Sequence, residues 1–205
     1  MALALADAPA RPDIPARPER TVVPVPAPLD ALFPYGGMVR GSVVAVDSLT
    51  VALALLANHS AAGGWCAVVG LPELGLAAAA DAGVDLQRFA VVSAPGEQWA
   101  VAVATLLDGV GVVLARTPAR VPANTARRLA ARTRERRAVL LTMGSWPEQV
   151  DLRIHLDSSE WTGLYDGYGR LAHRRTQLTA SGRGAAARER RVTAWLPLEA
   201  WPHGC

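Results

Sequence analysis

The sequence contains no lysine. All 21 of its lysine-plus-arginine residues are arginine. Any mechanism that requires a lysine amine is therefore excluded, whether the amine would contact the phosphates of a nucleotide or form a Schiff base with a carbonyl substrate. A GC-rich coding bias accounts for part of this replacement of lysine by arginine, but the chemical exclusion holds whatever its origin.

Cysteine and histidine are also scarce. Cys66 lies within an apolar run and Cys205 ends the chain, and there are four histidines. Two cysteines form neither a disulfide framework nor a set of four zinc ligands, and the histidines share no metal-ligand spacing with them. No metal site is therefore expected.

Long apolar runs are missing as well. A membrane-spanning helix needs ~18 or more apolar residues in succession, and the longest candidate, residues 101–115, is interrupted by Asp108 and two glycines. No basic segment leads an apolar one at the N-terminus, so a secretory signal is not expected. Together with the absence of a disulfide framework, this predicts a cytoplasmic protein with no membrane partner.

Charge is distributed unevenly along the chain. Residues 1–100 carry five arginines and nine acidic residues, a net charge of −4, and residues 101–205 carry sixteen arginines and nine acidic residues, a net charge of +7. The sum is the overall charge of +3. A basic half favours an anionic partner, such as DNA, or a surface that is simply solvated.

The length of 205 residues and a hydrophobic content of 51% are typical of one folded domain. Seven prolines lie within the first 28 residues. Because proline lacks a backbone donor and favours extended conformations, residues 1–28 are expected to form a flexible tail. The folded domain is then expected over residues 29–196, and a short C-terminal tail over residues 197–205.

Within this domain, short apolar runs alternate with helical segments. Helices are expected over residues 50–62, 73–82, 97–108 and 122–136. Strands that are apolar throughout and separated by helices predict a parallel sheet covered on both faces. After Gly144 the runs "DLRIHLD", "RLAHRRTQLTA" and "RRVTAWL" alternate apolar and polar residues, which predicts antiparallel strands. The expected fold is α/β, with a mostly parallel central sheet flanked by helices and antiparallel strands added at the C-terminal edge.

Several of these stretches resemble the RecA-type ATPase core. "LDALFPYGGMVRGSVVAV" is similar to the helix, glycine turn and first strand that precede the phosphate loop of that family. "WCAVVG" and "AGVDLQRFAVVSAPGEQWAVAVATLLDGVGVVLAR" are similar to the elements that follow. The resemblance covers residues 29–196 and implies a RecA-like fold.

The departures from that family fall on its nucleotide chemistry. After Val46 the chain has only "DSLT" before the helix, without the G-x-x-x-x-G-K-[ST] pattern whose backbone N–H groups surround phosphates. We interpret Asp47, Ser48 and Thr50 as a degenerate nucleotide site, in which a short segment caps the helix through a side-chain oxygen. No cofactor is expected.

Two further positions of the family's site are altered. Ala115 and Arg116 end the strand at which the family carries a metal-associated acid, and arginine does not bind Mg²⁺. Glu73 lies near the family's water-activating glutamate but is offset by one residue. We therefore expect no catalytic residue, and interpret Glu73 as an acid at a helix start.

The segments at the positions of the recombinase's two DNA-binding loops, Thr117–Ala123 and Ser145–Val150, are short. A RecA-like chain without a phosphate loop, an N-terminal filament helix or a long C-terminal domain is similar to ImuA-type proteins, specifically the actinobacterial ImuA-prime form. "WCAVVG", "GLYDGYGRL" and "ASGRGAAARERRV" carry this resemblance. It implies an accessory subunit of a DNA-damage-inducible mutasome. The implied partners are ImuB, an inactive Y-family polymerase homologue, and an error-prone C-family DNA polymerase that is contacted indirectly.

Two groups of arginines are candidates for binding DNA or a partner. On the helix 122–136, guanidiniums lie opposite an apolar stripe, and they either hold phosphates or form a solvated face. The helix carries Arg127, Arg128, Arg132, Arg134 and Arg136, and the candidates for binding are Arg127, Arg128, Arg132 and Arg136. The second group lies on the C-terminal hairpin, where "SGRGAAARERR" is expected to be a mobile basic loop or to protect an edge strand. Its arginines are Arg170, Arg174, Arg175, Arg183, Arg188, Arg190 and Arg191.

The six tryptophans are many for a chain with 5% aromatic residues. We expect Trp65 and Trp99 to pack in the core. The C-terminal "WLPLEAW" carries large apolar residues that are costly to expose, so it either docks on a partner or packs on its own domain. The docking residues would be Trp195, Leu196, Leu198 and Trp201.

These observations favour a non-catalytic adaptor that bridges the two polymerase homologues in error-prone translesion synthesis. Such a protein is cytoplasmic and associates with the nucleoid when recruited to damage. Two alternatives stay open: a module that binds DNA directly, and a regulator like the cell-division inhibitors related to this fold. An enzyme is the least favoured class, because no complete catalytic set is present.

Overall fold

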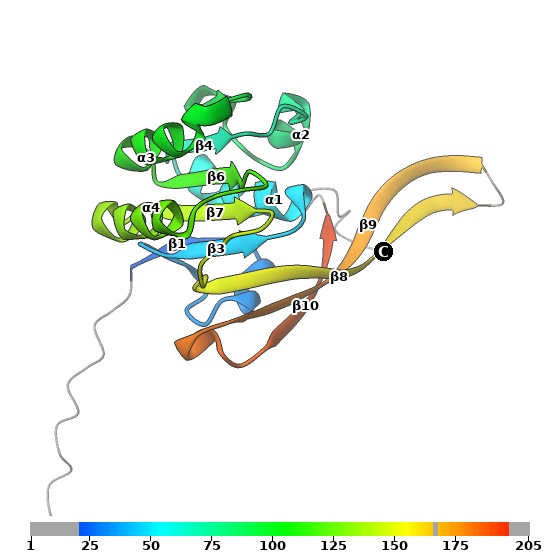
Figure 1. Ribbon diagram of the computed structural model, residues 1–205. Coiled ribbons are helices and arrows are strands. Elements are labelled where there is room, and N and C mark those ends of the chain that lie inside the picture. The colour runs from blue at the N-terminus through cyan, green and yellow to red at the C-terminus, as the bar shows by residue number, and fades with distance from the viewer. Residues whose placement is uncertain (1–20, 166–167, 197–205) are drawn as a thin grey trace, which may run out of the picture.

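An eight-stranded sheet runs through the molecule in the order β10-β9-β8-β3-β7-β6-β4-β5 (Figure 1). The fold is described from a computed structural model, which covers the backbone of residues 21–165 and 168–196 and the side chains of residues 21–162 and 174–196. The strands are β3 (Val43–Val46), β4 (Cys66–Val69), β5 (Phe89–Val92), β6 (Val112–Arg116), β7 (Val139–Met143), β8 (Leu152–Tyr165), β9 (Tyr168–Gly182) and β10 (Arg190–Leu196).

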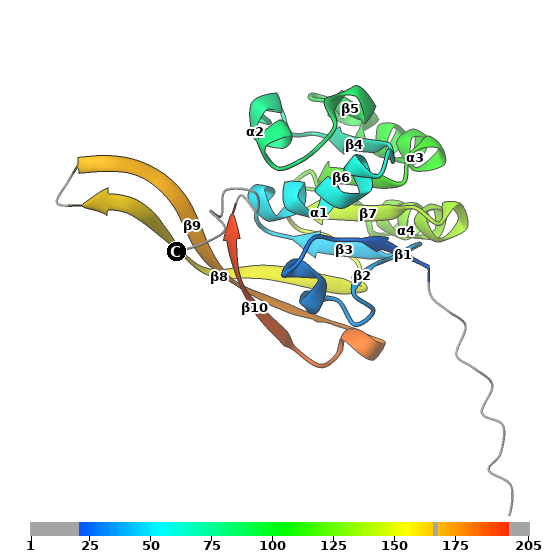
Figure 2. The ribbon, with the colours of Figure 1, turned by 180° about the vertical axis from the view of Figure 1, so that it is seen from behind.

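The strands from β5 to β3 are parallel, and β8 also pairs with β3 in parallel. Four helices cover them: α1 (Leu49–Ala61), α2 (Leu76–Asp81), α3 (Trp99–Gly109) and α4 (Ala123–Arg136). Side chains of α1 and α2 pack on one face of the sheet, and side chains of α3 and α4 pack on the other (Figures 1 and 2). The expected parallel sheet, apolar and buried on both faces, is confirmed.

The expected start of the folded domain at residue 29 is wrong by several residues. Strand β1 (Val22–Pro24) pairs antiparallel with β2 (Gly37–Val39), and the 3₁₀ turn η1 (Leu29–Leu32) lies between them. Their buried side chains belong to the same core cluster as those of α1. Because α1 is buried from Val51 to Ala57 without a polar interruption, its outer side needs a cover, and residues 22–33 supply it.

Two expected helices begin later than the sequence indicated. Helix α2 starts at Leu76 with Gly75 before it, instead of at Glu73, and Pro72 precedes this segment. The segment from residue 97 opens as a 3₁₀ turn, η3 (Gly96–Gln98), before α3 begins at Trp99. The expected helices at residues 50–62 and 122–136 are confirmed within one residue at each end.

The antiparallel strands form the C-terminal edge, as expected. Strands β8 and β9 make a hairpin whose distal part extends beyond the sheet as a curved arm, and β10 pairs with the proximal part of β9 (Figures 1 and 2). The connection from β9 to β10, expected to be a mobile loop, contains the 3₁₀ turn η4 (Gly184–Ala186). Ala186 is buried in the core, which fixes part of this connection to the domain.

The tryptophans divide between core and surface. Trp99 and Trp146 are buried, as expected for Trp99. The expectation that Trp65 packs in the core is wrong, because its side chain is 50% exposed just ahead of the first buried residue of β4. No helix within the described residues is long and apolar enough to cross a membrane.

Candidate functional site

The carboxyl ends of parallel strands are the usual location of a ligand site in an α/β sheet. Here β3 and α1 are separated by two residues, Asp47 and Ser48. Ser48 is the N-cap of α1: its hydroxyl accepts a hydrogen bond from the N–H of Val51 at 3.5 Å, and its carbonyl accepts one from Ala52 at 2.9 Å. The first turn of α1 is therefore capped by the chain itself, as the sequence indicated for Ser48.

Asp47 faces strand β8 instead of the helix. Its carboxylate is paired with the imidazole of His155 and accepts a hydrogen bond from the N–H of Leu156 at 3.1 Å. The register of β3 on β8 places Val46 beside Ile154, so the next residue along each strand forms this pair. Asp47 thus joins the carboxyl end of β3 to the interior of β8. Thr50 lies partly buried in the first turn of α1.

His155 was not singled out from the sequence. Its role depends on the parallel pairing of β3 with β8, which are more than a hundred residues apart along the chain. The alternating pattern "DLRIHLD" indicates a strand but not its neighbour in the sheet. The Asp47–His155 pair could have been identified only if the pairing of β8 with β3 had been known.

A second pair, an ion pair, connects the carboxyl end of β6 to the segment that follows β4. The guanidinium of Arg116, the last residue of β6, forms an ion pair with Glu73, which follows β4. Both side chains are about half exposed. The end of β6 therefore carries a cation that is paired with the carboxylate of Glu73.

These contacts do not fit a nucleotide with its magnesium ion. A phosphate would need free backbone N–H groups or an unpaired cation at this edge. Instead Ser48 caps α1, Asp47 contacts β8, and Arg116 is paired with Glu73. Among the described residues, no group of three or more histidine, cysteine, aspartate or glutamate side chains is placed to hold a metal ion.

Most of the expected arginines on α4 are paired within the molecule. Arg127 contacts Glu148 at 3.1 Å, and Arg132 and Arg136 both contact Asp108 of α3. The hydrogen bond from Arg132 is the main reason that the pKa of Asp108 lies below its usual range. Arg128 and Arg134 of this helix have no ion pair among the described residues. The helix face therefore presents less free positive charge than its sequence indicated.

The structure divides the arginines of the hairpin between two places. Arg174 and Arg175 lie at the base of the arm, opposite the last two residues of β10. Arg174 stacks over the exposed ring of Trp161 at 5.7 Å, and Arg175 is 3.9 Å from Glu160. The others lie near the connection from β9 to β10. The side chain of Arg170 lies outside the described residues.

Near that connection, Arg183 is paired with Asp151 at 2.6 Å and Arg191 with Glu189 at 2.8 Å. Arg190 donates to two backbone carbonyl oxygens, those of Ala185 and Arg188. The side chain of Arg188 is exposed and has no hydrogen bond or ion pair among the described residues.

The expected docking tail is partly inside the fold. Leu196 is buried in the core as the last residue of β10, and Trp195 is partly buried beside it. Leu196 therefore packs on its own domain instead of being presented to a partner. Leu198 and Trp201 lie outside the described residues.

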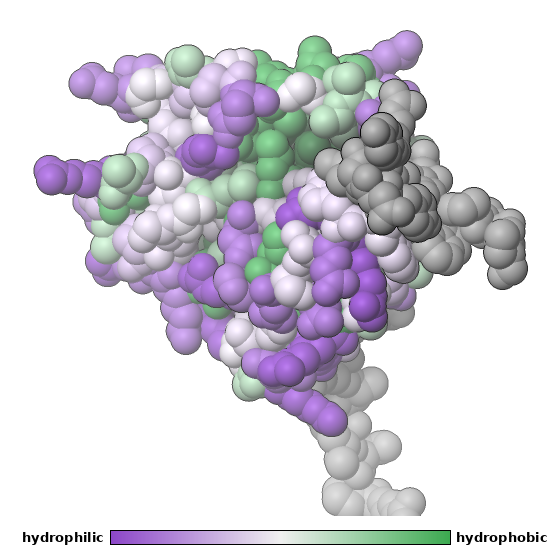
Figure 3. All heavy atoms as spheres, turned by 90° about the vertical axis from the view of Figure 1, so that its right-hand side faces the viewer, coloured by the Kyte–Doolittle hydropathy of each residue, from purple (hydrophilic) through white to green (hydrophobic). Residues whose placement is uncertain are grey.

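Apolar surface gathers at one side of the molecule. Figure 3 shows it in the upper part of the view that faces the carboxyl ends of the strands, whereas the rest of this face is mostly hydrophilic. Leu76 of α2 is 52% exposed, and Leu86 and Val91 near the edge strand β5 are also exposed. Strand β5 is one of the two edges of the sheet.

Comparison with known proteins finds one family whose model matches more than half of the chain. The family described as "MT3502 N-terminal domain" matches residues 31–148, which contain β3 to β7 and α1 to α4. The uncharacterized protein Rv3395c of Mycobacterium tuberculosis is 37% identical over 140 residues, which cover 64% of this chain and 68% of that protein. The matched segment includes the capped β3–α1 junction and the Arg116–Glu73 pair. The chain belongs to the MT3502 N-terminal domain family.

Proposed function

We propose that this protein is a non-catalytic adaptor of an error-prone translesion synthesis complex. Its partners would be an inactive Y-family polymerase homologue of the ImuB type and, indirectly, a C-family polymerase. The finer resemblance to the actinobacterial ImuA-prime form supports this assignment, and the mycobacterial relative is consistent with an actinobacterial origin. We further propose that the protein acts in the cytoplasm, at the nucleoid when DNA is damaged.

The observation that carries the proposal is the junction of β3 with α1. Two residues replace the phosphate loop, and both are engaged in contacts that stabilise the domain. The cation at the end of β6 adds to this, because it pairs with Glu73. A fold that has exchanged its nucleotide contacts for internal ones is suited to presenting surfaces to other proteins.

Calorimetric titration of the purified chain with ATP and Mg²⁺ tests the first half of the proposal. We expect no saturable heat at millimolar nucleotide, because the two-residue junction of β3 with α1 is too short to surround a phosphate and Arg116 is paired with Glu73. ATP binding in the micromolar range, or ATP hydrolysis by the pure protein, would contradict the proposed non-catalytic adaptor function.

Co-purification with the ImuB-type homologue tests the second half. The full chain is expected to retain the partner, and a chain ending at residue 196 keeps the core residue Leu196 while losing Leu198 and Trp201. Loss of the partner with this truncation would assign the docking to residues 197–205. No association with the full chain would sink the adaptor role.

Direct DNA binding is a second candidate, and the arm favours it. Trp161 is 53% exposed, and the guanidinium of Arg174 covers its ring at 5.7 Å. Exposed aromatic rings beside arginine are the stacking platforms of single-strand binding proteins. Fluorescence anisotropy with a labelled single strand should show affinity that falls steeply with salt and is lost in Trp161→Ala. Binding that is indifferent to salt and to this substitution would remove the candidate.

A further inference from the structure

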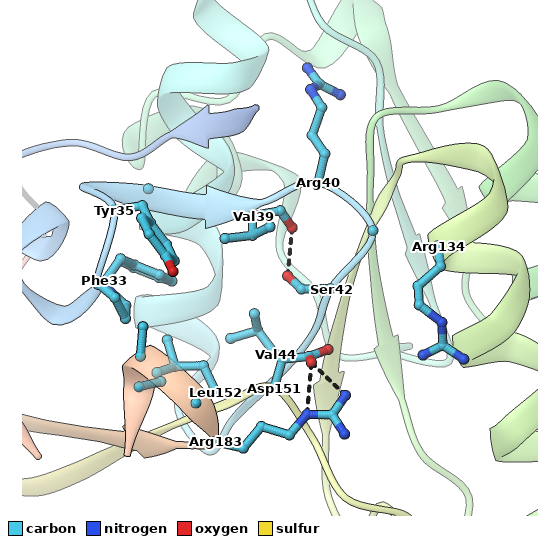
Figure 4. A pocket seen from close by; sticks show the side chains of 16 residues that line it. Phe33, Tyr35, Val39, Arg40, Ser42, Val44, Arg134, Asp151, Leu152 and Arg183 are labelled. Atoms are coloured by element: carbon cyan, nitrogen blue, oxygen red, sulfur yellow. Dashed lines mark hydrogen bonds and ion pairs between the residues drawn. The ribbon is translucent and has the colours of Figure 1, made fainter. Parts of the chain in front are cut away.

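A cavity of about 500 Å³ opens at the amino end of β3, at the opposite end of that strand from the capped junction (Figure 4). This volume lies within the range of ligand sites in proteins. Phe33 and Tyr35, which follow η1, form one wall, and Val44 and Leu152 form part of the floor. The cavity therefore combines aromatic and aliphatic surface with the polar groups at its rim.

The rim carries one balanced ion pair. Arg183 donates two hydrogen bonds to one oxygen of Asp151, at 3.0 and 2.6 Å. The other oxygen of Asp151 accepts from the N–H of Val43 at 2.9 Å. Because the charges of Asp151 and Arg183 compensate each other, this pair stabilises the rim but does not attract a charged ligand.

Two further arginines at the rim, Arg40 and Arg134, have no ion pair among the described residues. Arg134 is exposed and comes from the last turn of α4, where its neighbour Arg136 is paired with Asp108. In Figure 4 Arg134 extends downward on the side of the Asp151–Arg183 pair, whereas Arg40 points away from that pair. Arg134 is thus the cation best placed to meet an anionic group in the cavity.

The hydrogen bonding of the backbone at the rim favours a carboxylate over a phosphate as the ligand. The N–H groups of Gly41, Ser42 and Val43 are already donated to Ala138, Val39 and Asp151. A phosphate usually needs several free N–H groups or a cluster of cations, and the carboxylate of Asp151 would repel its second charge. A single carboxylate requires only one guanidinium, which binds it through two parallel hydrogen bonds.

We propose that this cavity binds a peptide segment of a partner protein in which a carboxylate side chain adjoins apolar residues. Arg134 pairs with the carboxylate, and the apolar side chains occupy the space between Phe33, Tyr35 and Leu152. The proposal rests on the adaptor function above for the existence of a partner. It adds the chemistry that the partner must present and a surface at the opposite end of the sheet from the capped junction.

Titration of the isotopically labelled full chain, followed by amide NMR, tests the site. The probes are the peptide acetyl-Ala-Phe-Asp-Leu-Ala-amide, its neutral analogue with Asn in place of Asp, and adenosine monophosphate. The acidic peptide is expected to shift the amides of Gly41, Ser42 and Gly184 saturably. The Asn peptide should bind about tenfold more weakly, the effect of losing one charge-assisted hydrogen bond.

Two variants on the same helix form a matched pair. Arg134→Gln should reduce the affinity for the acidic peptide to that for the Asn peptide, whereas Arg128→Gln should leave it unchanged, because Arg128 is equally exposed and unpaired but does not line the cavity. Ala185→Phe places a large side chain at the exposed rim and should weaken both peptides.

The proposal is overturned if neither peptide shifts those amides, if the Asp and Asn peptides bind equally, if Arg134→Gln has no effect, or if the nucleotide binds there more tightly than the acidic peptide. The titration needs no partner protein, so it separates the two proposals. Peptide binding without co-purification of the ImuB-type homologue would remove the adaptor role and keep the site. Co-purification without peptide binding would keep the adaptor role and remove this site.

Discussion

At the scale of single residues, burial shifts the pKa values of two side chains, those of His59 and Cys66. His59 is packed so closely that a Cβ on Gly64 would lie 2.3 Å from its ring, and a Cβ on Gly111 would lie 2.2 Å from it. Both positions are glycine because the imidazole occupies the space of a side chain. Cys66 is fully buried in β4.

The packing of His59 predicts a pH-dependent stability. Burial, and secondarily the charge of Arg40, hold the pKa of His59 below its usual 6.5. The unfolded chain then binds more protons than the folded one, so stability is complete above pH ~6.5 and falls as the pH drops through that value. Urea unfolding at pH 7.5 and 5.5 should show this loss in the wild type and a smaller loss in His59→Gln. An equal loss in both proteins would contradict the assignment.

Cys66 is expected to be unreactive. Burial raises the pKa of its thiol to about 12, so only roughly one part in 10⁴ is thiolate at pH 8. In a Cys205→Ser chain, Ellman's reagent should detect no thiol under native conditions and one thiol in guanidinium chloride. Rapid native labelling would show that β4 opens more readily than its burial indicates.

At the scale of elements, the distribution of apolar residues on each helix determines which other segments must pack against it. From Val51 to Ala57 helix α1 is apolar on all sides, and its outer side is closed by the segment from β1 to η1. Helix α4, by contrast, is amphipathic: Ala126, Leu129 and Thr133 are buried, and most of its arginines are exposed. A wholly apolar helix therefore indicates a second layer that must come from elsewhere in the chain.

This requirement predicts that β1 is part of the core. Val23 is fully buried, and replacing it by alanine should destabilise the domain by ~2 kcal/mol through lost burial and a cavity. Val22→Ala, on the same strand but partly exposed, should cost less. Chemical denaturation of both variants measures the difference, and equal values would show that β1 is only loosely attached.

The elements also show what the sequence could and could not predict. The parallel strands and their helices were recognised because each apolar run is local, and Ser48 was recognised as a cap because capping is local too. The pairing of Asp47 with His155 and of Arg134 with the cavity at β3 depends on which strands and helices become neighbours. Proline density gave the wrong boundary near residue 29, since proline restricts the backbone but does not prevent Val23 and Val25 from being buried.

At the scale of the whole molecule, stability should be graded from the sheet centre to the arm. Strands β7 and β6 are paired on both sides and covered on both faces, whereas the distal part of the arm is a two-stranded ribbon without a third strand. Amide hydrogen exchange should therefore be slowest in β6 and β7 and fastest in residues 162–165 and 168–173, which lie beyond the last pairing with β10. Comparable protection in these two regions would indicate that another protein or a second copy covers the arm.

The path of the chain through the sheet gives the domain a polarity. Thr21 lies beside Arg40 at the amino end of β3, and β10, which runs parallel to β3, ends at Leu196 at the other end (Figure 1). Residues 21 and 196 therefore lie at opposite ends of the sheet. A dye at position 21 and another at position 196 would therefore mark opposite poles, and the shielding of one dye but not the other would reveal which way round the molecule sits in a larger assembly.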